Sequence, residues 1–311
     1  MEPIMSILVL GAGELGMQVI KATVRYKAVQ EHTTSLAVVL RPVSSSSSKD
    51  ASEIEALGCS IIRHDVAASD IDDLARIFAD YDAVVSCLGY AAGPGVQLNI
   101  TRAVLKARVK RFFPWQFGVD YDAIGRGSGQ TLFDEQLDVR ELLRAQTDVD
   151  WVIVTTGVFM SFVFESFFGV VEGVKDFGAE AITVRALGAW DNGLSVTAVE
   201  DIGTLTAAIL FDETVKQEVI YTSGDTFSYR QLSDVVGNVM RKPIKTELWT
   251  RDHLATELTK DPKDTVRKYR VAFAAGKGVL WDKKKTYNAR KNIATYDVKR
   301  WLEENILPQK K

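Results

Sequence analysis

The sequence has few of the residues that build metal sites and disulfide frameworks. Its 311 residues include two cysteines, Cys59 and Cys87, and three histidines at scattered positions. Two cysteines cannot form a disulfide framework or a cysteine-rich zinc site. Both lie in apolar runs, which is typical of buried, reduced thiols in a cytoplasmic protein. We therefore expect no metal site and a cytoplasmic location.

The sequence also lacks a strong net charge and a long hydrophobic run. Its 38 basic and 41 acidic residues leave a net charge of −3, which does not favour nucleic acid as the main partner. The longest apolar stretch, residues 151–164, is shorter than the ~20 residues of a membrane helix. No basic segment of a secretory signal is evident at the N-terminus. We expect neither a nucleic-acid nor a membrane partner. We interpret the basic residues from Lys277 to the end as a solvated tail.

Short β-branched runs alternate with helix-length segments through the first half of the chain. The runs are almost wholly apolar, as in strands covered on both faces, and the segments between them repeat apolar residues at intervals of three and four. This alternation predicts an α/β fold, a Rossmann doubly wound parallel sheet. The predicted strands are 6–10, 36–40, 59–62, 83–87, 111–113 and 151–155, and the predicted helices are 16–26, 52–57, 71–78, 97–107 and 133–144.

The second half loses this alternation. Residues 204–210 and 229–240 read as helices and 219–222 as a strand, whereas 163–191 mixes glycine and aromatic residues without a clear period. We predict a cofactor-binding Rossmann domain over residues 1–157. A smaller C-terminal substrate-binding region follows over 158–311, with some elements returning to the sheet.

A glycine motif follows the first predicted strand and opens a helix. Gly11, Gly13 and Gly16, with Glu14 and Leu15 between them, match G-x-G-x-x-G, the dinucleotide-binding fingerprint. Gly11 permits the tight turn, Gly13 lets the backbone approach a pyrophosphate, and Gly16 lets the helix pack on the strand. The alternative is a structural glycine-rich turn.

The end of the second strand indicates which dinucleotide is bound. An NAD-binding site usually has a carboxylate there, but this strand ends at Arg41, followed by serines and Lys49. A guanidinium can bind a phosphate through two hydrogen bonds. We therefore predict NADP(H), held by Arg41 and Lys49; the alternative is that Arg41 points only to solvent.

Later strand ends should face the same cofactor, because ligands lie outside the carboxyl ends of such strands. Asp65, after the third strand, could reach the adenine side or lie in a surface turn. The residues expected at the cofactor are Cys87, Leu88 and Gly89 after the fourth strand and Gly157, Val158 and Phe159 after the sixth.

Several segments together resemble a known family. The most specific is Val109-Lys-Arg-Phe-Phe-Pro-Trp-Gln-Phe-Gly-Val-Asp-Tyr-Asp122, accompanied by the glycine motif, Arg41, Phe133-Asp-Glu-Gln-Leu-Asp-Val-Arg140 and Val199-Glu-Asp-Ile-Gly203. The sequence resembles the NmrA-like and isoflavone-reductase-like branch of the atypical short-chain dehydrogenases, and fungal secondary-metabolism members in particular. The resemblance implies a Rossmann domain, NADP(H) and reduction of aromatic or phenolic small molecules.

The resemblance also implies a catalytic lysine in a Phe-x-x-Lys-x-x-(Ile/Val)-Arg pattern. Matching Phe133, Val139 and Arg140 to it places Gln136 at the lysine position. An amide cannot give up a proton as an ammonium can, although it can still hydrogen-bond to a carbonyl oxygen. The Tyr-x-x-x-Lys pair that is usual in short-chain dehydrogenases is absent from its normal place. Tyr287 and Lys291 have the same spacing, which we interpret as a coincidence.

Candidate site residues follow the fifth strand. Trp115 and Phe117 could wall an aromatic substrate or fill the core. Gln116 could donate to a substrate carbonyl or be a solvated loop amide, and Tyr121 could move a proton. Asp120 and Asp122 could also move a proton as bases, but we expect one of them to cap a helix or turn.

The substrate region should begin with an aromatic-rich stretch. We propose Phe162 of this stretch as a substrate contact, because ligand pockets are mostly apolar. The alternative is that the stretch belongs to the hydrophobic core. The other phenylalanines of the stretch are Phe159, Phe164, Phe167 and Phe168.

Three functions are compatible with these residues. The first is an NADPH-dependent reductase of an aromatic or polycyclic natural-product intermediate, with Gln136, Gln116 or Tyr121 replacing the lysine. The second is an NADP(H)-dependent cyclase or isomerase acting on an alkaloid-like substrate, in which reduction of a cation needs no proton donor. The third is a non-catalytic redox sensor. We expect a monomer or a homodimer.

Overall fold

The computed structural model describes residues 6–30, 35–42 and 48–307. The chain forms two compact units. The first comprises residues 1–117, 135–154 and 202–220, and the second comprises 118–134, 155–201 and 221–311. The chain therefore passes between the units after residues 117, 134, 154, 201 and 220, and the predicted border after residue 157 lies inside the second unit.

A seven-stranded sheet in the order β11-β6-β5-β4-β1-β2-β3 forms the centre of the first unit. The pairs from β3 through β6 are parallel, so the predicted Rossmann fold is confirmed. The strand order reverses between β1 and β4, which is where ligands bind in doubly wound sheets. The strands are β1 (Ser6–Leu10), β2 (Ser35–Leu40), β3 (Ser60–Arg63), β4 (Ala83–Ser86), β5 (Arg111–Phe113), β6 (Asp150–Thr155) and β11 (Glu218–Tyr221).

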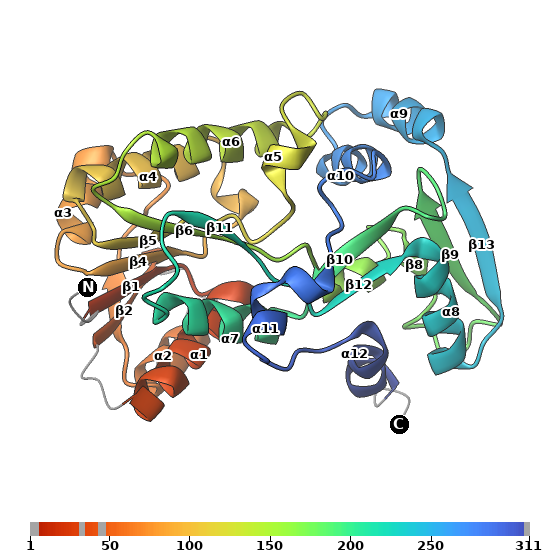
Figure 1. Cartoon of the computed structure of the whole chain (residues 1–311), viewed down its shortest axis with the longest axis horizontal. Helices are drawn as coiled ribbons and strands as arrows, with labels where there is room; N and C mark the ends of the chain where they lie inside the picture. Colours follow the sequence, from red (N-terminus) through yellow and green to blue (C-terminus); the bar gives the residue numbers. More distant parts are fainter. Residues whose placement is uncertain (1–5, 31–34, 43–47, 308–311) are drawn as a thin grey trace. The chain divides into compact units, whose positions relative to one another are not determined.

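Helices cover both faces of this sheet (Figure 1). α3, α4 and α6 lie on one face, and α1, α2 and α7 lie on the other. Both faces of the central strands are therefore buried, which explains why their sequences are almost uninterrupted apolar runs. The helices are α1 (Glu14–Gln30), α2 (Ser48–Ala56), α3 (Ile71–Phe78), α4 (Val96–Ala107), α6 (Thr131–Arg144) and α7 (Val199–Leu210).

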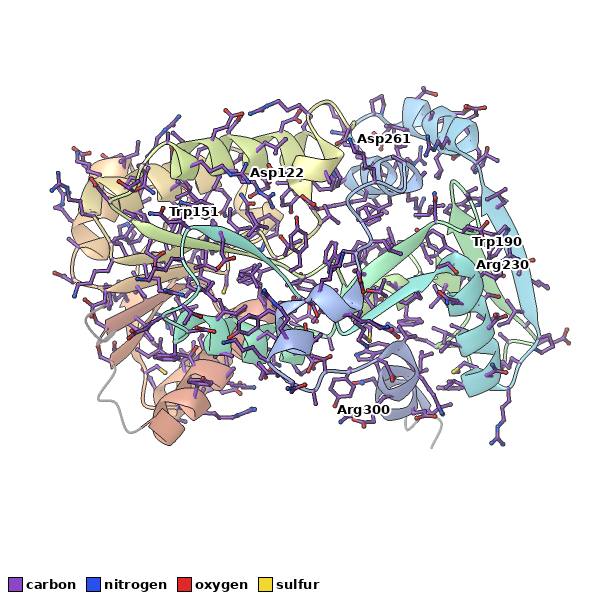
Figure 2. All side chains as sticks on the ribbon, in the orientation of Figure 1. Asp122, Trp151, Trp190, Arg230, Asp261 and Arg300 are labelled. Atoms are coloured by element: carbon purple, nitrogen blue, oxygen red, sulfur yellow. The ribbon has the colours of Figure 1, made fainter. Side chains whose placement is uncertain are left out.

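A buried arginine ties the returning segment to the sheet of the first unit. Arg111 of β5 is fully buried, pairs with Asp150 at 2.9 Å and donates to the carbonyls of Ile209, Asp212 and Val215. Burial lowers the pKa of the Arg111 guanidinium, and Asp150 opposes that change. Trp151, beside this pair on β6 (Figure 2), belongs to the main apolar cluster.

The second unit contains two three-stranded sheets, ordered β12-β10-β7 and β13-β9-β8. The predicted helix at 229–240 is α8, which begins with a capping box between Ser228 and Gln231. The strands are β7 (Val158–Phe159), β8 (Val171–Glu172), β9 (Ile182–Leu187), β10 (Gly193–Thr197), β12 (Asp225–Ser228) and β13 (Ile244–Trp249). The helices are α5 (Tyr121–Ile124), α8 (Tyr229–Met240), α9 (Arg251–Lys260), α10 (Thr265–Ala274), α11 (Tyr287–Arg290) and α12 (Val298–Asn305), with short 3-10 turns η1 (Tyr90–Ala92), η2 (Met160–Phe164) and η3 (Lys283–Lys285).

Candidate cofactor and substrate site

The glycine motif forms the turn between β1 and α1. Gly11 has a φ of +88°, and its N–H donates to the Val39 carbonyl at 3.0 Å. A Cβ on Gly16 would lie 2.2 Å from the Gly11 carbonyl oxygen, so α1 can approach the turn only with glycine there. A Cβ on Gly13 would meet nothing within 4 Å. The turn is thus tight at Gly11 and Gly16 and open at Gly13, where a pyrophosphate would be bound.

The first turn of α1 adds two features to this site. N–H groups in a first helical turn lack partners within the helix and carry the positive end of its dipole. Glu14 is exposed, whereas Leu15 is only 5% exposed and belongs to the core. Of the two residues, Glu14 is therefore the more exposed to solvent.

The second strand ends at Leu40, and Arg41 follows it as an exposed residue. The Arg41 carbonyl accepts a hydrogen bond from Arg63 at 3.3 Å, which holds the backbone at this strand end. No carboxylate follows in the sequence before Asp50. The side chain of Lys49, our other phosphate candidate, lies outside the described residues.

The segment after β4 packs against the glycine turn. The Cys87 N–H donates to the Leu10 carbonyl at 2.9 Å, and the Leu88 side chain lies 2.7 Å from the position of a Cβ on Gly11. Burial raises the pKa of the Cys87 thiol, so this cysteine is an inert packing residue. Cys87 and Leu88 therefore form the wall of the turn.

Gly89 and Trp115 bring together the ends of β4 and β5. A Cβ on Gly89 would lie 3.6 Å from the Trp115 ring, which is half-buried. The indole therefore lies in contact distance of a strand end that lacks a side chain. Phe117, the other predicted aromatic wall, is 5% exposed and belongs to the core.

Gln116 connects the loop after β5 to helix α6. Its amide nitrogen donates to the Gln136 carbonyl at 2.8 Å, and its amide oxygen accepts from the Nε of Arg140 at 2.8 Å. All three residues are fully buried. Both polar atoms of the Gln116 amide are therefore used within the fold. Through these two bonds, Gln116 positions helix α6 and with it the backbone of Gln136.

The side chain of Gln136 differs from that of Gln116. It is fully buried, yet among the described residues neither its amide nitrogen nor its amide oxygen has a hydrogen-bond partner. A buried polar atom without a partner costs about 1–3 kcal/mol. The lack of partners, at the position that the resemblance gives to a lysine, keeps Gln136 a candidate for binding a ligand, and that role stays a prediction.

Two further residues, which the sequence analysis did not identify, hold this part of the site. The carboxylate of Glu135 accepts from the N–H groups of Gly95 and Gln97 at the start of α4. The Gln97 amide in turn bonds to the Ser86 hydroxyl and the Leu88 carbonyl. A capping carboxylate 40 residues from its helix has no local sequence signal.

The segment after β6 lies in the second unit. Gly157 has a φ of +73°, its N–H donates to the Gly118 carbonyl, and a Cβ on it would lie 2.0 Å from the Ser195 carbonyl oxygen. Val158 and Phe159 form β7 and pair with β10. The close approach of β10 thus requires a glycine at 157 for a structural reason, and a cofactor role for these three residues stays a prediction.

Tyr121 and Asp120 lie at the start of α5 in the second unit. Asp120 caps the helix by accepting from the Ala123 N–H, as expected, and also accepts from the Tyr221 hydroxyl at 2.8 Å. Tyr121 is 4% exposed, and its hydroxyl lies 2.6 Å from the position of a Cβ on Gly118. Gly118 therefore leaves room for this phenol.

Phe162 belongs to an aromatic cluster of the second unit. Its ring lies 4.6 Å from that of Phe168 and 6.4 Å from that of Tyr269, while Tyr269 lies 5.7 Å from Phe133. Tyr269 comes from α10, more than 100 residues along the chain, and nothing in its local sequence indicates the contact. Phe162 is half-buried, and Phe167 beside it is 52% exposed.

Two weaker candidates have local roles. The Asp65 carboxylate accepts from the N–H groups of Ala67 and Ala68. These bonds are those of a local turn, as in the second of the two interpretations given for Asp65. The Lys291 ammonium lies 5.6 Å from the centre of the Tyr287 ring, and Tyr287 is 3% exposed. This is a local cation–π contact.

Within the described ranges, no group of three histidine, cysteine or acidic side chains comes together as a metal site would require. In the same residues, no helix combines the length and the apolar character needed to span a membrane.

The sequence matches the NmrA-like family over residues 5–269. It is also 40% identical over 306 residues to an NmrA-like family domain-containing oxidoreductase of Gibberella moniliformis, covering 96% of this chain and 97% of the relative. The chain therefore belongs to the NmrA-like family, and the predicted resemblance is confirmed.

Several solved structures have the same fold, two named reductases among them. The complex of Vitis vinifera leucoanthocyanidin reductase with NADPH superposes with a TM-score of 0.79 at 18% identity, covering 97% of this chain and 99% of that one. An isoflavone reductase superposes with a TM-score of 0.74 at 16% identity over 96% and 98% of the two chains. AtPrR2 with NADP+ and (+)pinoresinol gives 0.73 at 18% identity over 97% and 99%.

Proposed function

We propose that this protein is an NADP(H)-dependent oxidoreductase that transfers a hydride to an aromatic or polycyclic small molecule. The observation that carries the proposal is the turn after β1, which is open at Gly13. The neighbouring strand β2 is followed by Arg41 and not by a carboxylate. Three similar proteins support it: an oxidoreductase, a leucoanthocyanidin reductase solved with NADPH, and AtPrR2, which was solved with NADP+.

The residues present fit an adenine dinucleotide phosphate. The backbone at Gly13 and the first turn of α1 would hold the pyrophosphate, and Arg41 would bind the 2′-phosphate. The bound cofactor supplies the hydride. Trp115, lying on Gly89 at the ends of β4 and β5, would stack on an aromatic ligand.

Gln136 is proposed as the residue that binds the polar group of the substrate. Its amide offers a donor and an acceptor, and both are buried without partners among the described residues. A neutral amide orients a substrate oxygen or nitrogen but does not deliver a proton as a lysine would. We propose the phenol of Tyr121 as the proton donor where a reduction needs one.

A redox-neutral cyclisation of an alkaloid-like substrate is the second candidate. The observation that favours it is again the neutral Gln136, because hydride transfer to an already cationic acceptor requires no proton. For the overall reaction to be redox-neutral, a later step must return a hydride from the substrate to the oxidised cofactor. The fungal relative is compatible with both candidates.

The cofactor assignment is tested by titrating NADPH and NADH into three proteins. Arg41→Ala should weaken NADPH binding about tenfold or more and leave NADH binding unchanged, because it removes the contact to one phosphate. Gly13→Ala is the matched control: it should weaken both cofactors, because its methyl group takes the open space above the turn. Equal losses for both cofactors in Arg41→Ala would refute the NADP(H) assignment.

The reaction is tested by incubating the protein with phenolic ketones, enones and polycyclic imines, with and without NADPH. A reductase consumes NADPH and yields products heavier by two hydrogens. A cyclase yields products of unchanged mass without net consumption of cofactor. Tight cofactor binding without turnover of any compound would instead favour the redox sensor and contradict both enzyme proposals.

A further inference from the structure

The strand β13 forms the outer edge of a sheet in the second unit. The sheet order is β13-β9-β8, so β13 pairs with β9 on one side, and Figure 1 shows no strand beyond it. Its sequence is Ile-Lys-Thr-Glu-Leu-Trp, and the four central residues, Lys245 to Leu248, are all exposed. Leu248 is 45% exposed, which makes it one of three large apolar residues that the described structure leaves exposed.

The hydrogen bonds to β9 show which backbone groups of β13 remain at the open edge. The N–H groups of Ile182 and Gly188 donate to the carbonyls of Pro243 and Trp249, at 3.0 and 2.8 Å. Successive residues of a strand direct their backbone groups to opposite sides, so the odd-numbered residues of β13 face β9. Ile244, Thr246 and Leu248 therefore direct their N–H and C=O groups outward, away from β9.

The sequence of this edge is complementary to itself when two copies run antiparallel. If the two-fold axis passes through Thr246, the paired residues are 246 with 246, 244 with 248, and 245 with 247. Ile244 then faces Leu248 of the second copy, and Lys245 faces Glu247 of the second copy. Thr246 with itself, and Ile244 with Leu248, fall at hydrogen-bonded positions, which matches the outward direction of their backbone groups.

The charged pair falls at the position where cross-strand side chains are closest. Lys245 and Glu247 lie on the same face and at a non-hydrogen-bonded pair of the antiparallel arrangement. Glu247 is already held by Arg185 at 2.6 Å, so its carboxylate is oriented before a partner arrives. A two-fold axis through Lys245 or Glu247 would instead place like charges opposite each other, which selects the register centred on Thr246.

We propose that β13 pairs edge to edge with β13 of a second copy of this chain, which joins two three-stranded sheets into one of six strands. Charged residues can also serve to block the edge of a sheet. A blocking function would not require opposite charges and apolar residues placed symmetrically about one threonine. The interface is small, so the dimer is expected to be reversible.

Sedimentation velocity of the full-length protein over a concentration series tests the proposal. The wild type should show a reversible monomer–dimer equilibrium. Thr246→Pro removes an outward N–H without touching the ladder to β9, so it should be monomeric and folded. Thr246→Ser is the matched control and should dimerise as the wild type does. A wild type that stays monomeric, or a Thr246→Pro variant that dimerises normally, would overturn the proposal.

Charge exchange provides a second test that does not depend on proline. Lys245→Glu and Glu247→Lys should each weaken self-association about tenfold or more, because each places like charges opposite each other twice. An equimolar mixture should restore dimers, since a negative edge then faces a positive one. Failure of the mixture to associate, with both variants folded by circular dichroism, would count against this register.

Discussion

Replacing Gln136 by methionine should make the protein more stable while removing the polar group that we assign to substrate binding. Methionine has nearly the same shape as glutamine and no strong hydrogen-bonding atoms. The fully buried amide of Gln136 has two polar atoms without partners among the described residues. Each such atom costs about 1–3 kcal/mol, so removing both should raise the free energy of unfolding by roughly 2 kcal/mol or more.

Gln97 provides the matched control. Its side chain is also buried, at 4% exposure, but its amide bonds to the Ser86 hydroxyl and to the Leu88 carbonyl at 2.8 Å. Gln97→Met should therefore lower the free energy of unfolding by about 1–3 kcal/mol. The same chemical change at two buried glutamines is thus expected to have opposite signs.

Urea denaturation of the ligand-free protein, followed by circular dichroism, measures both variants. For a chain of 311 residues, a gain of 2 kcal/mol corresponds to a rise in melting temperature of about 3 °C, which a thermal melt checks independently. If Gln136→Met loses stability to the same extent as Gln97→Met, the Gln136 amide has partners in solution, and its assignment to the substrate loses its physical basis.

Two other charged residues give predictions of their own. Arg111→Met should cost about 3–5 kcal/mol of stability in denaturant titrations, because it leaves Asp150 in the fold without its partner; a loss below ~1 kcal/mol would show that the pair is dispensable. Burial raises the pKa of Asp201, whose carboxylate accepts from the Tyr296 N–H, to about 6 from its ordinary 3.8. A raised pKa means that the stabilising, protonated form is fully present below about pH 4 and is lost as the pH rises toward 6. Asp201→Asn should therefore gain roughly 2–3 kcal/mol relative to the wild type between pH 4 and pH 7, and a pH-independent difference would contradict this.

The sequence predicted the first unit well because its signals are local. Strands buried on both faces read as apolar runs, and the predicted strand at 6–10 matches β1 residue for residue. The helix predicted at 71–78 likewise coincides with α3. The glycine motif needed no tertiary information either, because the turn at Gly11 is a property of the backbone.

The rest of the site depends on contacts between distant residues. The sequence placed Gln116 and Gln136 in the site but could not show that the first is bound at both ends and the second at neither. The pairing of Phe162 with Tyr269 joins segments more than 100 residues apart. In residues 163–191, where no period was found, the structure has short strands whose order is set by pairing with residues beyond position 240.

The path of the chain restricts how the protein can be divided or recombined. Neither unit is a continuous stretch of sequence, since residues 202–220 complete the sheet that residues 6–10 begin. No single cut can therefore release one half as an intact module, and swapping halves with a relative would require several simultaneous junctions. Point changes, by contrast, alter either unit without creating any such junction.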